Sequence, residues 1–402
     1  MMISVEAARA RILAGLSPTS AESVPLAAAW GRVSAASVVA RLSQPARDVS
    51  AMDGYAVRAE AGTLGATLRV VGSAPAGHPW SGNIAGDAAL RLFTGSVMPH
   101  GADCVVPQED AERHGDTVVL TEAAQPGRHV RRAGQDFAAG DLLVAAGQRL
   151  GARQVGLVAA GNHPWVSVHQ RPRVAILATG DEIVLPGEAV PDGGVVSSNA
   201  HALAALVRAS GGEPVVLQVA GDNRAALVAG TAAARGCDLL LTTGGASVGD
   251  HDLVRQTLQE QGMALDFWRI AMRPGKPLLH GWIGRLAVIG LPGNPVSTLV
   301  TAILFVIPAI ERLSGLAGDP PAIEPARTGT NLPANDLRAD YLRASLERGP
   351  DGVLVATALA RQDSSMLRAM AQAGCLIVRP PHAPATPSGE SVSVIRLDRV
   401  GI

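Results

Sequence analysis

The sequence predicts a multidomain protein of the α/β plus β class. With 402 residues, the chain is long enough for roughly two to four domains. Between residues 171 and 318, apolar strand-like runs alternate with helical segments, which is the pattern of a parallel sheet covered by helices on both faces. Residues 41–135 and 319–402 instead hold short β-like runs separated by Gly, Pro and Asp. The sequence therefore places an α/β domain between two β-rich regions.

The first 170 residues predict a helical platform, formed by residues 1–40 and 136–170, with a β-rich insertion. An Ala-rich apolar pattern begins at the N-terminus and stops near Gly15 to Pro18, and a second helical segment runs from Ala152 to Ala160. Because these segments flank residues 41–135, we expect the intervening residues to form an inserted domain. Its predicted strands are Leu68–Val71, Leu90–Phe93, Cys104–Val106 and Thr117–Leu120.

The α/β domain is expected over residues 171–318, with Ser198 and Asp222 as helix N-caps. Ligands of such domains bind outside the carboxyl ends of the strands. The expected strands are Arg173–Ala178, Val215–Val219, Asp238–Thr243, Leu265–Ile270 and Leu286–Ile289. The expected helices are Asn199–Ser210, a helix from Asp222 to about Ala234, Leu253–Gln261, and a long helix after Pro295.

A small all-β domain is expected at the C-terminus, after a Gly- and Pro-rich linker at residues 314–325. Its predicted strands are Tyr341–Leu346, Val353–Ala358, Leu376–Val378 and Val392–Leu397.

Composition excludes several classes of protein. The 34 basic and 35 acidic residues nearly cancel, whereas a general nucleic-acid binder would show a basic excess. The three cysteines form no C-x-x-C pair, so neither a disulfide framework nor a zinc ribbon is supported. The longest apolar run, Val296–Ile310, is interrupted by hydroxyl residues and Pro308, and we expect it to be a buried helix rather than a membrane span. The N-terminus lacks a secretory pattern, so a cytoplasmic protein is expected.

Only one lysine, Lys276, occurs among the basic residues. A sequence background that favours arginine would explain the other basic residues, and chance would then explain this lysine. The alternative is that the position requires a compact ammonium rather than a planar guanidinium. Its setting between Pro274 and Pro277 favours that alternative, because the prolines restrict the loop that carries it.

Cationic residues gather at one predicted strand end. Arg269, Arg273 and Lys276 either form a solvated basic face or an oxyanion pocket. Nearby, residues 291–295 (Leu-Pro-Gly-Asn-Pro) form a rigid turn that would place the backbone amides of Val296 and Ser297 at a helix N-terminus, a setting suited to an anion.

Acidic residues gather at the same predicted edge. The Gly-rich loop at residues 244–249 is either a tight structural turn or a phosphate cradle, and it matches neither the P-loop nor the dinucleotide fingerprint. Asp250 is explained by stabilisation of the helix dipole. Glu182, Asp222 and Asp252 together could hold a hard cation such as Mg²⁺ jointly with phosphate oxygens.

Several segments, taken together, resemble the MoeA family of molybdopterin molybdenumtransferases. The resemblance covers essentially the whole chain, with the motifs in the family's order. The segments are SAMDGYAV (50–57), FTGSVMPHGADCVVPQE (93–109), ATGDEIV (178–184), LLTTGGASVGDHD (240–252), FWRIAMRPGKP (267–277) and GLPGNPVS (290–297).

The resemblance implies an architecture and a set of site residues. The expected parts are the platform, the insertion, a three-layer α/β/α molybdopterin-binding domain and a C-terminal β-barrel, in a homodimer whose active-site cleft combines two chains. Asp53, Glu182, Asp222, Asp252 and Lys276 match the family's catalytic positions, and Glu182, Asp222 and Asp252 its metal positions. The matching substrate positions are Thr94, Arg131, Asp136, Arg273, Pro292, Pro295, Ser297, Arg343 and Ser364. Gly244, Gly245, Ser247 and Arg269 are added as substrate-binding candidates from the Gly-rich loop and the cationic strand end.

The implied reaction converts adenylylated molybdopterin and molybdate to molybdenum cofactor and AMP, with Mg²⁺ or another divalent cation. The resemblance also implies the molybdopterin adenylyltransferase and molybdoenzyme insertion chaperones as candidate partners. Three features depart from the family pattern. Arg269 and Arg273 stand where lysine is frequent, Gln135 replaces a frequent Glu, and Asp363 precedes Ser364 where Gly is usual.

Two other functions are weighed against this one. The adenylyltransferase that makes the substrate shares the α/β core, but such proteins are short, single-domain chains whose loop reads Gly-Gly-Thr-Gly. A non-catalytic scaffold, like the gephyrin relatives that cluster receptors, is the second alternative. The joint presence of Asp53, Glu182, Asp252 and Lys276 favours the enzyme.

Overall fold

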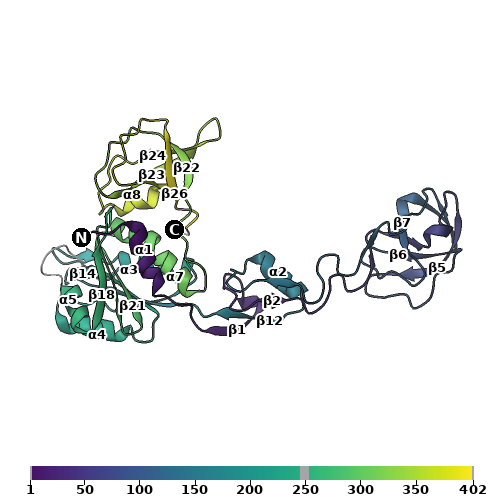
Figure 1. Cartoon of the computed structure of the whole chain (residues 1–402), viewed down its shortest axis with the longest axis horizontal. Helices are drawn as coiled ribbons and strands as arrows, with labels where there is room; N and C mark the ends of the chain where they lie inside the picture. Colours follow the sequence, from purple (N-terminus) through teal and green to yellow (C-terminus); the bar gives the residue numbers. More distant parts are fainter. Residues whose placement is uncertain (1, 245–252, 401–402) are drawn as a thin grey trace. The chain divides into compact units, whose positions relative to one another are not determined.

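A computed structural model describes residues 2–244 and 253–400 of the chain (Figure 1). The chain divides into two compact units. Unit 1 comprises residues 1–22, 31–35 and 167–402, and unit 2 comprises residues 23–30 and 36–166. The division falls within strands β1 (Ala21–Pro25) and β12 (Trp165–His169). The four domain boundaries expected from the sequence stay a prediction.

Unit 1 is built on a mixed six-stranded sheet of order β16-β13-β17-β21-β20-β18. The first four strands are parallel, but β20 and β18 run antiparallel to their neighbours, so the expectation of a wholly parallel sheet is wrong at this edge. The cause is a two-residue turn, Gly284-Arg285, that joins β20 directly to β21 as a hairpin. The strands are β13 (Arg173–Ala178), β16 (Glu213–Val216), β17 (Leu239–Thr243), β18 (Met263–Arg269), β20 (Pro277–Ile283) and β21 (Leu286–Leu291).

Side chains on alternate positions of the sheet enter two separate cores. Val174 and Ile176 pack with residues of α1, α3, α6 and α7, whereas Ala175 and Leu177 pack with residues of α4 and α5. This alternation follows from the two-residue period of a strand. The helices are α1 (Val5–Ala14), α3 (Asn199–Ala209), α4 (Arg224–Ala233), α5 (Leu253–Glu260), α6 (Pro295–Thr301) and α7 (Ile307–Leu313).

Two expected helix caps differ in the structure. Asn223, not Asp222, caps α4, because its side chain accepts a hydrogen bond from the Ala226 amide. Ser198 precedes α3 in an αR conformation and makes no side-chain cap bond. Asp222 is instead held through its backbone, which leaves its carboxylate outside the cap.

The apolar run after Pro295 forms one helix from Pro295 to Leu313, in which a π-helical segment (Ala302–Val306) joins α6 to α7. The helix is long and apolar enough to cross a membrane by length and composition, yet 78% of its apolar window is buried inside the protein. Phe305 at its centre is fully buried. The prediction of a buried core helix is confirmed.

The C-terminal part of unit 1 is a closed five-stranded barrel. The strand order β23-β24-β22-β26-β25 closes because β25 also pairs with β23. The short strand β19 (Met272–Arg273) pairs in parallel with β23 and so fixes the loop before β20 against the barrel. The predicted all-β domain and barrel are therefore confirmed. The strands are β22 (Glu324–Thr328), β23 (Ala339–Arg348), β24 (Leu354–Ala358), β25 (Cys375–Arg379) and β26 (Ser391–Arg396), and helix α8 (Leu367–Gln372) lies between β24 and β25.

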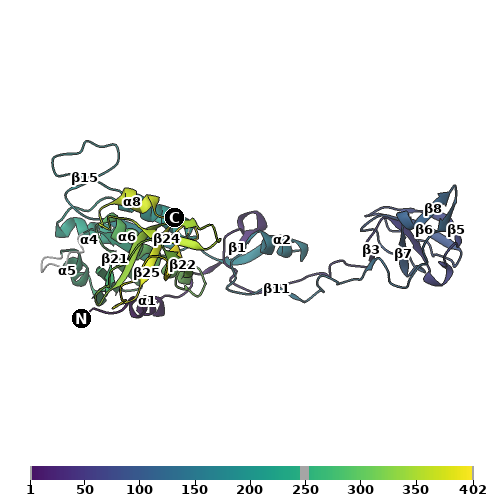
Figure 2. The same cartoon turned by 90° about the horizontal axis from the view of Figure 1, so that it is seen from above.

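One loop of unit 1 extends away from the sheet (Figure 2). It carries the two-stranded ribbon of β14 (Ile183–Val184) and β15 (Val195–Val196), which pair in parallel. The loop follows directly from the end of β13 through the Thr-Gly-Asp-Glu segment at residues 179–182.

Unit 2 has its own six-stranded sheet, of order β7-β4-β6-β5-β9-β8, with buried side chains on both faces. The predicted strands of the insertion are confirmed within a few residues. The strands are β4 (Gly54–Val57), β5 (Thr67–Ala74), β6 (Ala88–Leu92), β7 (Cys104–Pro107), β8 (Ala111–His114) and β9 (Thr117–Leu120).

The expected helical platform is largely wrong. Helix α2 spans Ala152–Ala160, as expected, but α1 belongs to unit 1 and packs against α7. Residues 16–40 form strands and turns, because prolines at 18 and 25 interrupt any helix there. The rest of the platform contains two pairs of short strands, β1 with β12 and β2 (Val38–Val39) with β11 (Leu142–Val144). A further pair, β3 (Val49–Ser50) with β10 (Val130–Arg131), lies within the expected insertion.

Candidate anion-binding site

A cavity of about 670 Å³ lies where the carboxyl end of β21 meets the barrel. Three segments line it: the loop from Met272 to Pro277, residues 292–294 with Ser297, and residues 362–364 with Arg338 from the barrel. The carboxyl-end position is where ligands of α/β sheets bind.

The first segment is held in place by backbone contacts. The Ile270 amide donates to the Lys276 carbonyl at 2.9 Å, and β19 pairs with β23. Gly275 has a φ of 107°, and a Cβ at this position would lie 2.5 Å from Cγ2 of Thr301 on α6. Only glycine fits, since the loop backbone is left-handed and packs directly on the helix.

Lys276 and Arg273 line the cavity, but only the arginine is engaged. Nη2 of Arg273 donates to Oδ2 of Asp336 at 2.6 Å, and Nε lies 3.6 Å from Oδ1 of Asp340. Lys276 is half-buried and has no hydrogen bond or ion pair of its ammonium with any residue in the described ranges. The single lysine of the chain therefore supplies to the cavity wall a positive charge that is not paired within the described residues.

Asp336 binds two arginines at the rim. Besides Arg273, it accepts hydrogen bonds from the side chain of Arg338, with Nη2 at 2.8 Å. The hydrogen bonds from Arg338 lower the pKa of Asp336 far below its usual value, with a smaller contribution from the charge of Arg273. Asp336 is therefore ionised and offsets part of the positive charge at this rim.

The second segment is the turn that leads into helix α6. The hydroxyl of Thr298 donates to the Pro292 carbonyl at 2.6 Å, and Nδ2 of Asn199 donates to the Gly293 carbonyl at 2.7 Å. Nδ2 of Asn294 donates to Oγ of Ser364 at 2.8 Å. The Val296 amide donates to the Ser364 carbonyl, so this amide, expected to face an anion, is occupied. Ser297 lines the cavity.

The third segment is positioned by a buried arginine. Arg343 is 1% exposed and does not line the cavity; its Nη1 donates to the Asp363 carbonyl at 2.7 Å and its Nη2 to the Arg361 carbonyl at 3.3 Å. Gln362 completes the arrangement, because its Oε1 accepts from the Arg343 amide at 3.0 Å. Burial lowers the pKa of Arg343. The guanidinium thus holds the loop that presents Ser364.

Asp363, a departure from the family pattern, lines the same cavity. Its Oδ1 accepts hydrogen bonds from the Ser365 hydroxyl at 2.6 Å and from the Ser365 amide at 2.8 Å. These two bonds lower the pKa of Asp363, so the carboxylate stays charged near the proposed anion position.

Two other expected pocket residues lie elsewhere. The guanidinium of Arg269 stacks on the Trp268 ring at 3.8 Å and does not line the cavity. Pro295 begins α6 and also stays outside the lining, whereas Pro292 contributes to it.

The acidic edge is described in part. Glu182 and Asp222 are both exposed, and the backbone segments that carry them lie side by side. The Gly180 amide donates to the Ala220 carbonyl, and the Asp222 amide donates to Oδ1 of Asp181. No group of three His, Cys, Asp or Glu side chains within residues 2–244 and 253–400 could hold a metal. Asp252, the third expected ligand, lies outside these ranges, as do Gly245 and Ser247. Carboxylate oxygens are nonetheless the donor set of a hard cation.

Gly244 lies at the start of the expected phosphate loop. Its φ is 96°, and a Cβ would lie 2.2 Å from the Thr179 carbonyl oxygen. Glycine is therefore required here for close packing of β17 against the end of β13, and the choice between a tight turn and a phosphate cradle stays a prediction.

In unit 2, Asp53 and Thr94 form a local pair. Oδ1 of Asp53 accepts from the Thr94 amide at 2.7 Å and from its hydroxyl at 2.9 Å. These bonds lower the pKa of Asp53, with a smaller contribution from the charge of Arg91. Arg131 lies exposed in β10, and the Asp136 amide donates to the Gln44 carbonyl.

Three polar residues of the cavity wall were not among the site residues predicted from the sequence. Asn294 stood inside a quoted motif, and its position between two prolines was the available signal. Arg338 and Gln362 gave no signal, because they reach the cavity only through the pairing of β19 with β23 and the bonds of Arg343.

Models of three protein regions match successive parts of the chain. Residues 3–161 match the MoeA N-terminal region (domain I and II), residues 175–312 a "Probable molybdopterin binding domain", and residues 325–397 the MoeA C-terminal region (domain IV). A curated relative from Nostoc is 37% identical over 94% of this chain and 88% of its own length. The chain belongs to the MoeA family. The Nostoc protein and a Haemophilus influenzae relative, 32% identical over 98% of both chains, are both named molybdopterin molybdenumtransferase.

A solved structure supports membership of the MoeA family at the level of the fold. The molybdopterin biosynthesis MoeA protein of Pyrococcus horikoshii superposes with a TM-score of 0.85 at 30% identity, covering 98% of this chain and 99% of its own. The MoeA resemblance predicted from the sequence motifs is therefore confirmed.

Proposed function

We propose that the chain is a molybdopterin molybdenumtransferase that inserts molybdenum from molybdate into adenylylated molybdopterin, with release of AMP. The observation that carries the proposal is the cavity at the carboxyl end of β21, which is lined by both Lys276 and Ser297 and in which the ammonium pairs with no residue of the described ranges. Full-length relatives named for this activity support it.

Molybdate is a dianion of four oxygens, so its site needs cationic and hydroxyl donors. Lys276 would supply the charge, and Ser297 and Ser364 would supply hydroxyls from two further walls of the cavity. Asn294 donates to Oγ of Ser364, which leaves the Ser364 proton free to face the anion. Arg343 fixes the loop that carries Ser364 and acts as a positioning residue.

Seven other expected site residues would contact the metal, nucleotide and pterin parts of the substrate complex. Glu182, Asp222 and Asp252 would hold Mg²⁺ or another divalent cation, which would neutralise phosphate charge as the P–O bond to AMP breaks. Asp53, Thr94, Arg131 and Asp136 of unit 2 would contact the substrate of a partner chain in a homodimer. The dithiolene that accepts molybdenum belongs to the substrate, so no protein cysteine takes part.

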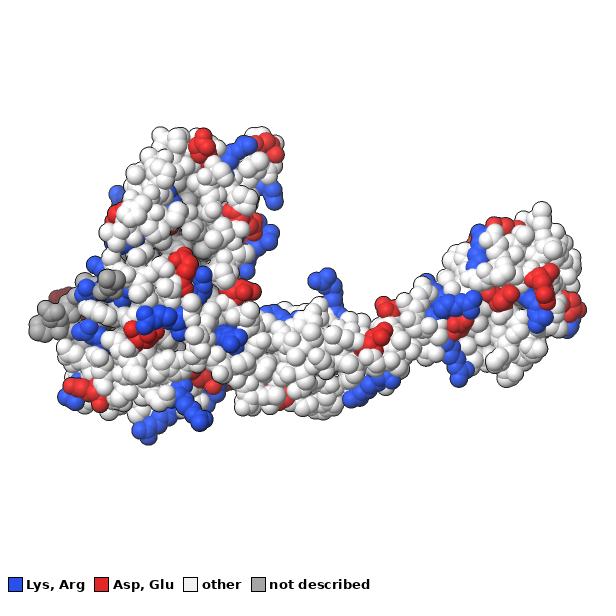
Figure 3. Space-filling model, in the orientation of Figure 1, with Lys and Arg blue, Asp and Glu red and all other residues white. Residues whose placement is uncertain are grey.

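The surroundings of the enzyme follow from the same proposal. It would act in the cytoplasm without nucleic acid or membrane, and it would exchange substrate and product with the molybdopterin adenylyltransferase and with insertion chaperones. On the face shown in Figure 3, acidic and basic side chains are interspersed, which agrees with the nearly balanced composition.

The test is AMP release from adenylylated molybdopterin by the purified protein with Mg²⁺, with and without molybdate. Lys276→Ala and Ser364→Ala are the variants, and Arg47→Ala, an exposed residue of unit 2, is the matched control. We expect molybdate to stimulate AMP release in the wild type and control but not in Lys276→Ala. Nucleotide binding without AMP release at any molybdate concentration would refute the enzyme and favour a partner-binding paralogue.

A further inference from the structure

A second cavity, of about 1140 Å³, lies at the opposite end of the central sheet of unit 1. Asp238 and Leu286, at the amino ends of β17 and β21, belong to its lining. The anion site instead lies after the carboxyl end of β21, at Pro292. Along the six residues of β21 the two ends are about 17 Å apart. The two cavities share no lining residue, so the larger one is a separate feature of the fold.

Apolar side chains form one part of the wall of this cavity. Leu16 and Leu313 come from the ends of α1 and α7, Val228 from α4, and Ile283 from β20. Trp282 also lines the wall, and its ring is fixed because it packs directly on Gly15, where a Cβ would lie 2.4 Å from Cζ2. A rigid aromatic face beside aliphatic side chains is the usual wall of a small-molecule pocket.

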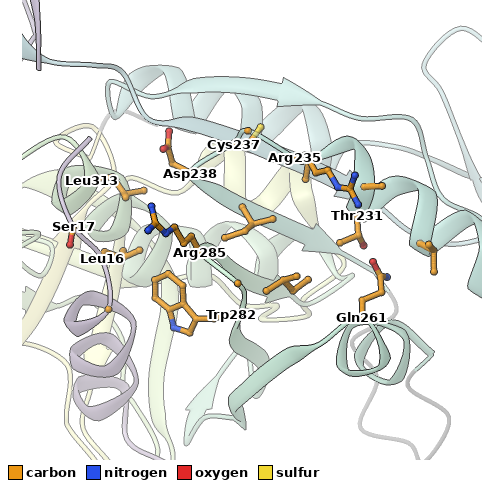
Figure 4. A pocket seen from close by; sticks show the side chains of 18 residues that line it. Leu16, Ser17, Thr231, Arg235, Cys237, Asp238, Gln261, Trp282, Arg285 and Leu313 are labelled. Carbon is orange, nitrogen blue, oxygen red and sulfur yellow. The ribbon is translucent and has the colours of Figure 1, made fainter. Parts of the chain in front are cut away.

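Two arginines supply charge to this apolar wall. Arg235 follows α4 and Arg285 lies in the β20–β21 turn, and Figure 4 shows their side chains at two separate places around the cavity. Both residues are exposed, and neither guanidinium has an ion pair or hydrogen bond with any residue among 2–244 and 253–400. The one carboxylate in the lining, Asp238, already accepts from the Arg173 amide at 2.7 Å.

Gln261 and Cys237, both half-buried, also belong to the lining. Nε2 of Gln261 is buried and has no hydrogen-bond acceptor among the described residues, although its side chain borders the cavity. Cys237 contributes a neutral wall, because burial raises the pKa of its thiol.

We propose that this cavity binds a small aromatic anion, a planar ring system that carries a sulfonate, phosphate or carboxylate group. The ring packs against Trp282 and the aliphatic wall, and the anionic group binds Arg285 or Arg235. The volume of about 1140 Å³ slightly exceeds the usual range for small-molecule pockets, roughly 300–1,000 Å³, and so leaves room for a planar ring system. The site is distinct from the proposed molybdate site and does not depend on the proposed function.

The test uses two probes with nearly the same rings. Anilinonaphthalene sulfonate carries an anionic group and N-phenylnaphthylamine carries none, and binding of each is titrated by probe fluorescence on the full chain. The test variant is Arg235→Gln/Arg285→Gln. Its matched control is Arg47→Gln/Arg208→Gln, which removes two exposed arginines elsewhere. Lys276→Ala reports any contribution of the molybdate cavity, and thermal unfolding checks that each variant is folded.

We expect saturable binding of the sulfonate at one site per chain, at least tenfold weaker in Arg235→Gln/Arg285→Gln and unchanged in the control pair and in Lys276→Ala. Trp282→Phe should remove most of the energy transfer from protein to probe. Equal binding of the uncharged probe, or unchanged binding in the test variant, would overturn the proposal. Dissociation of an oligomer in the test variant, measured by sedimentation, would also overturn it and assign the cavity to a contact between copies of the chain.

Discussion

At the residue scale, the candidate anion site depends on which cations already have partners. Arg273 is engaged by Asp336 and Asp340, and Arg343 by backbone carbonyls, whereas the Lys276 ammonium has no such partner among the described residues. The sequence indicated Lys276 because it is the only lysine in the sequence and because prolines stand on both sides of it. It could not show that Arg343 lies behind the cavity wall, because that depends on the folding of the barrel around it.

Replacement of Lys276 by arginine tests whether the site needs an ammonium. We expect Lys276→Arg to recover less than a tenth of the wild-type molybdate-dependent AMP release, and Lys276→Ala to lose about 100-fold, the usual effect of removing one charge-stabilising donor. The reason is that a planar guanidinium on a loop restricted by Pro274 and Pro277 cannot take the position of a compact ammonium. Steady-state kinetics over molybdate concentration measures this. Full activity of Lys276→Arg would contradict the account.

Asp336 provides a prediction about anion affinity. It shares its charge between Arg273 and Arg338, so Asp336→Asn should release both guanidinium groups and tighten molybdate binding several-fold. Calorimetric titration of wild type and variant measures the difference. Weaker binding in the variant would show that Asp336 orients the arginines rather than competing for them.

The same carboxylate provides a prediction about pH. The pKa of Asp336 is lowered in the folded protein, so its stabilising contribution is present above the unfolded value of about 3.9 and is lost as the pH falls through the folded value. The stability difference between wild type and Asp336→Asn should therefore be present at pH 6 and shrink below pH 4. Urea unfolding at both pH values measures it, and a difference that grows in acid would contradict the sign.

At the element scale, strands and helices with a clear local signal were predicted well. The bounds of β13, β9 and α2 are those expected, because apolar runs with Gly or Pro at their ends are sufficient to define them. Strand β20 was not predicted, and the antiparallel edge of the sheet was therefore not predicted either. Its apolar run alone does not distinguish a strand from a loop that packs beside a buried strand. Pairing partners are non-local and leave no signal in one sequence.

The loop before β20 depends on one glycine. Gly275→Ala would place a Cβ 2.5 Å from Thr301 in a left-handed backbone, which should cost about 1–2 kcal/mol from the backbone alone and displace Lys276. We expect a lower melting temperature and weaker molybdate binding. The matched control is Gly156→Ala in α2, where a Cβ meets no atom within 4 Å and should stabilise by about 0.5–1 kcal/mol. Unfolding scans compare the two, and an unperturbed Gly275→Ala would refute the packing argument.

At the scale of the whole molecule, the expected site residues are divided between two units with separate cores. Lys276, Ser297 and Ser364 belong to unit 1, and Asp53 and Thr94 to unit 2. Composition and periodicity do not explain why the expected site residues are divided between two units, whereas the family resemblance does. It implies that one active site combines unit 1 of one chain with unit 2 of its partner.

Mixing two inactive variants tests that implication. In a dimer of Asp53→Asn with Lys276→Ala chains, one of the two shared sites would carry neither substitution. If half of the dimers are mixed after exchange of chains, about a quarter of the wild-type AMP release should return. Each variant alone should stay inactive. No recovery in a mixture shown by mass spectrometry to contain mixed dimers would place each site within a single chain.

The most direct test of the anion site is anomalous diffraction at the molybdenum edge from crystals of the protein soaked in molybdate. We predict one molybdenum peak per chain, in the cavity lined by Lys276, Ser297 and Ser364, that is absent from Lys276→Ala crystals. A peak at another place, or an empty cavity at molybdate concentrations that saturate AMP release, would contradict the account.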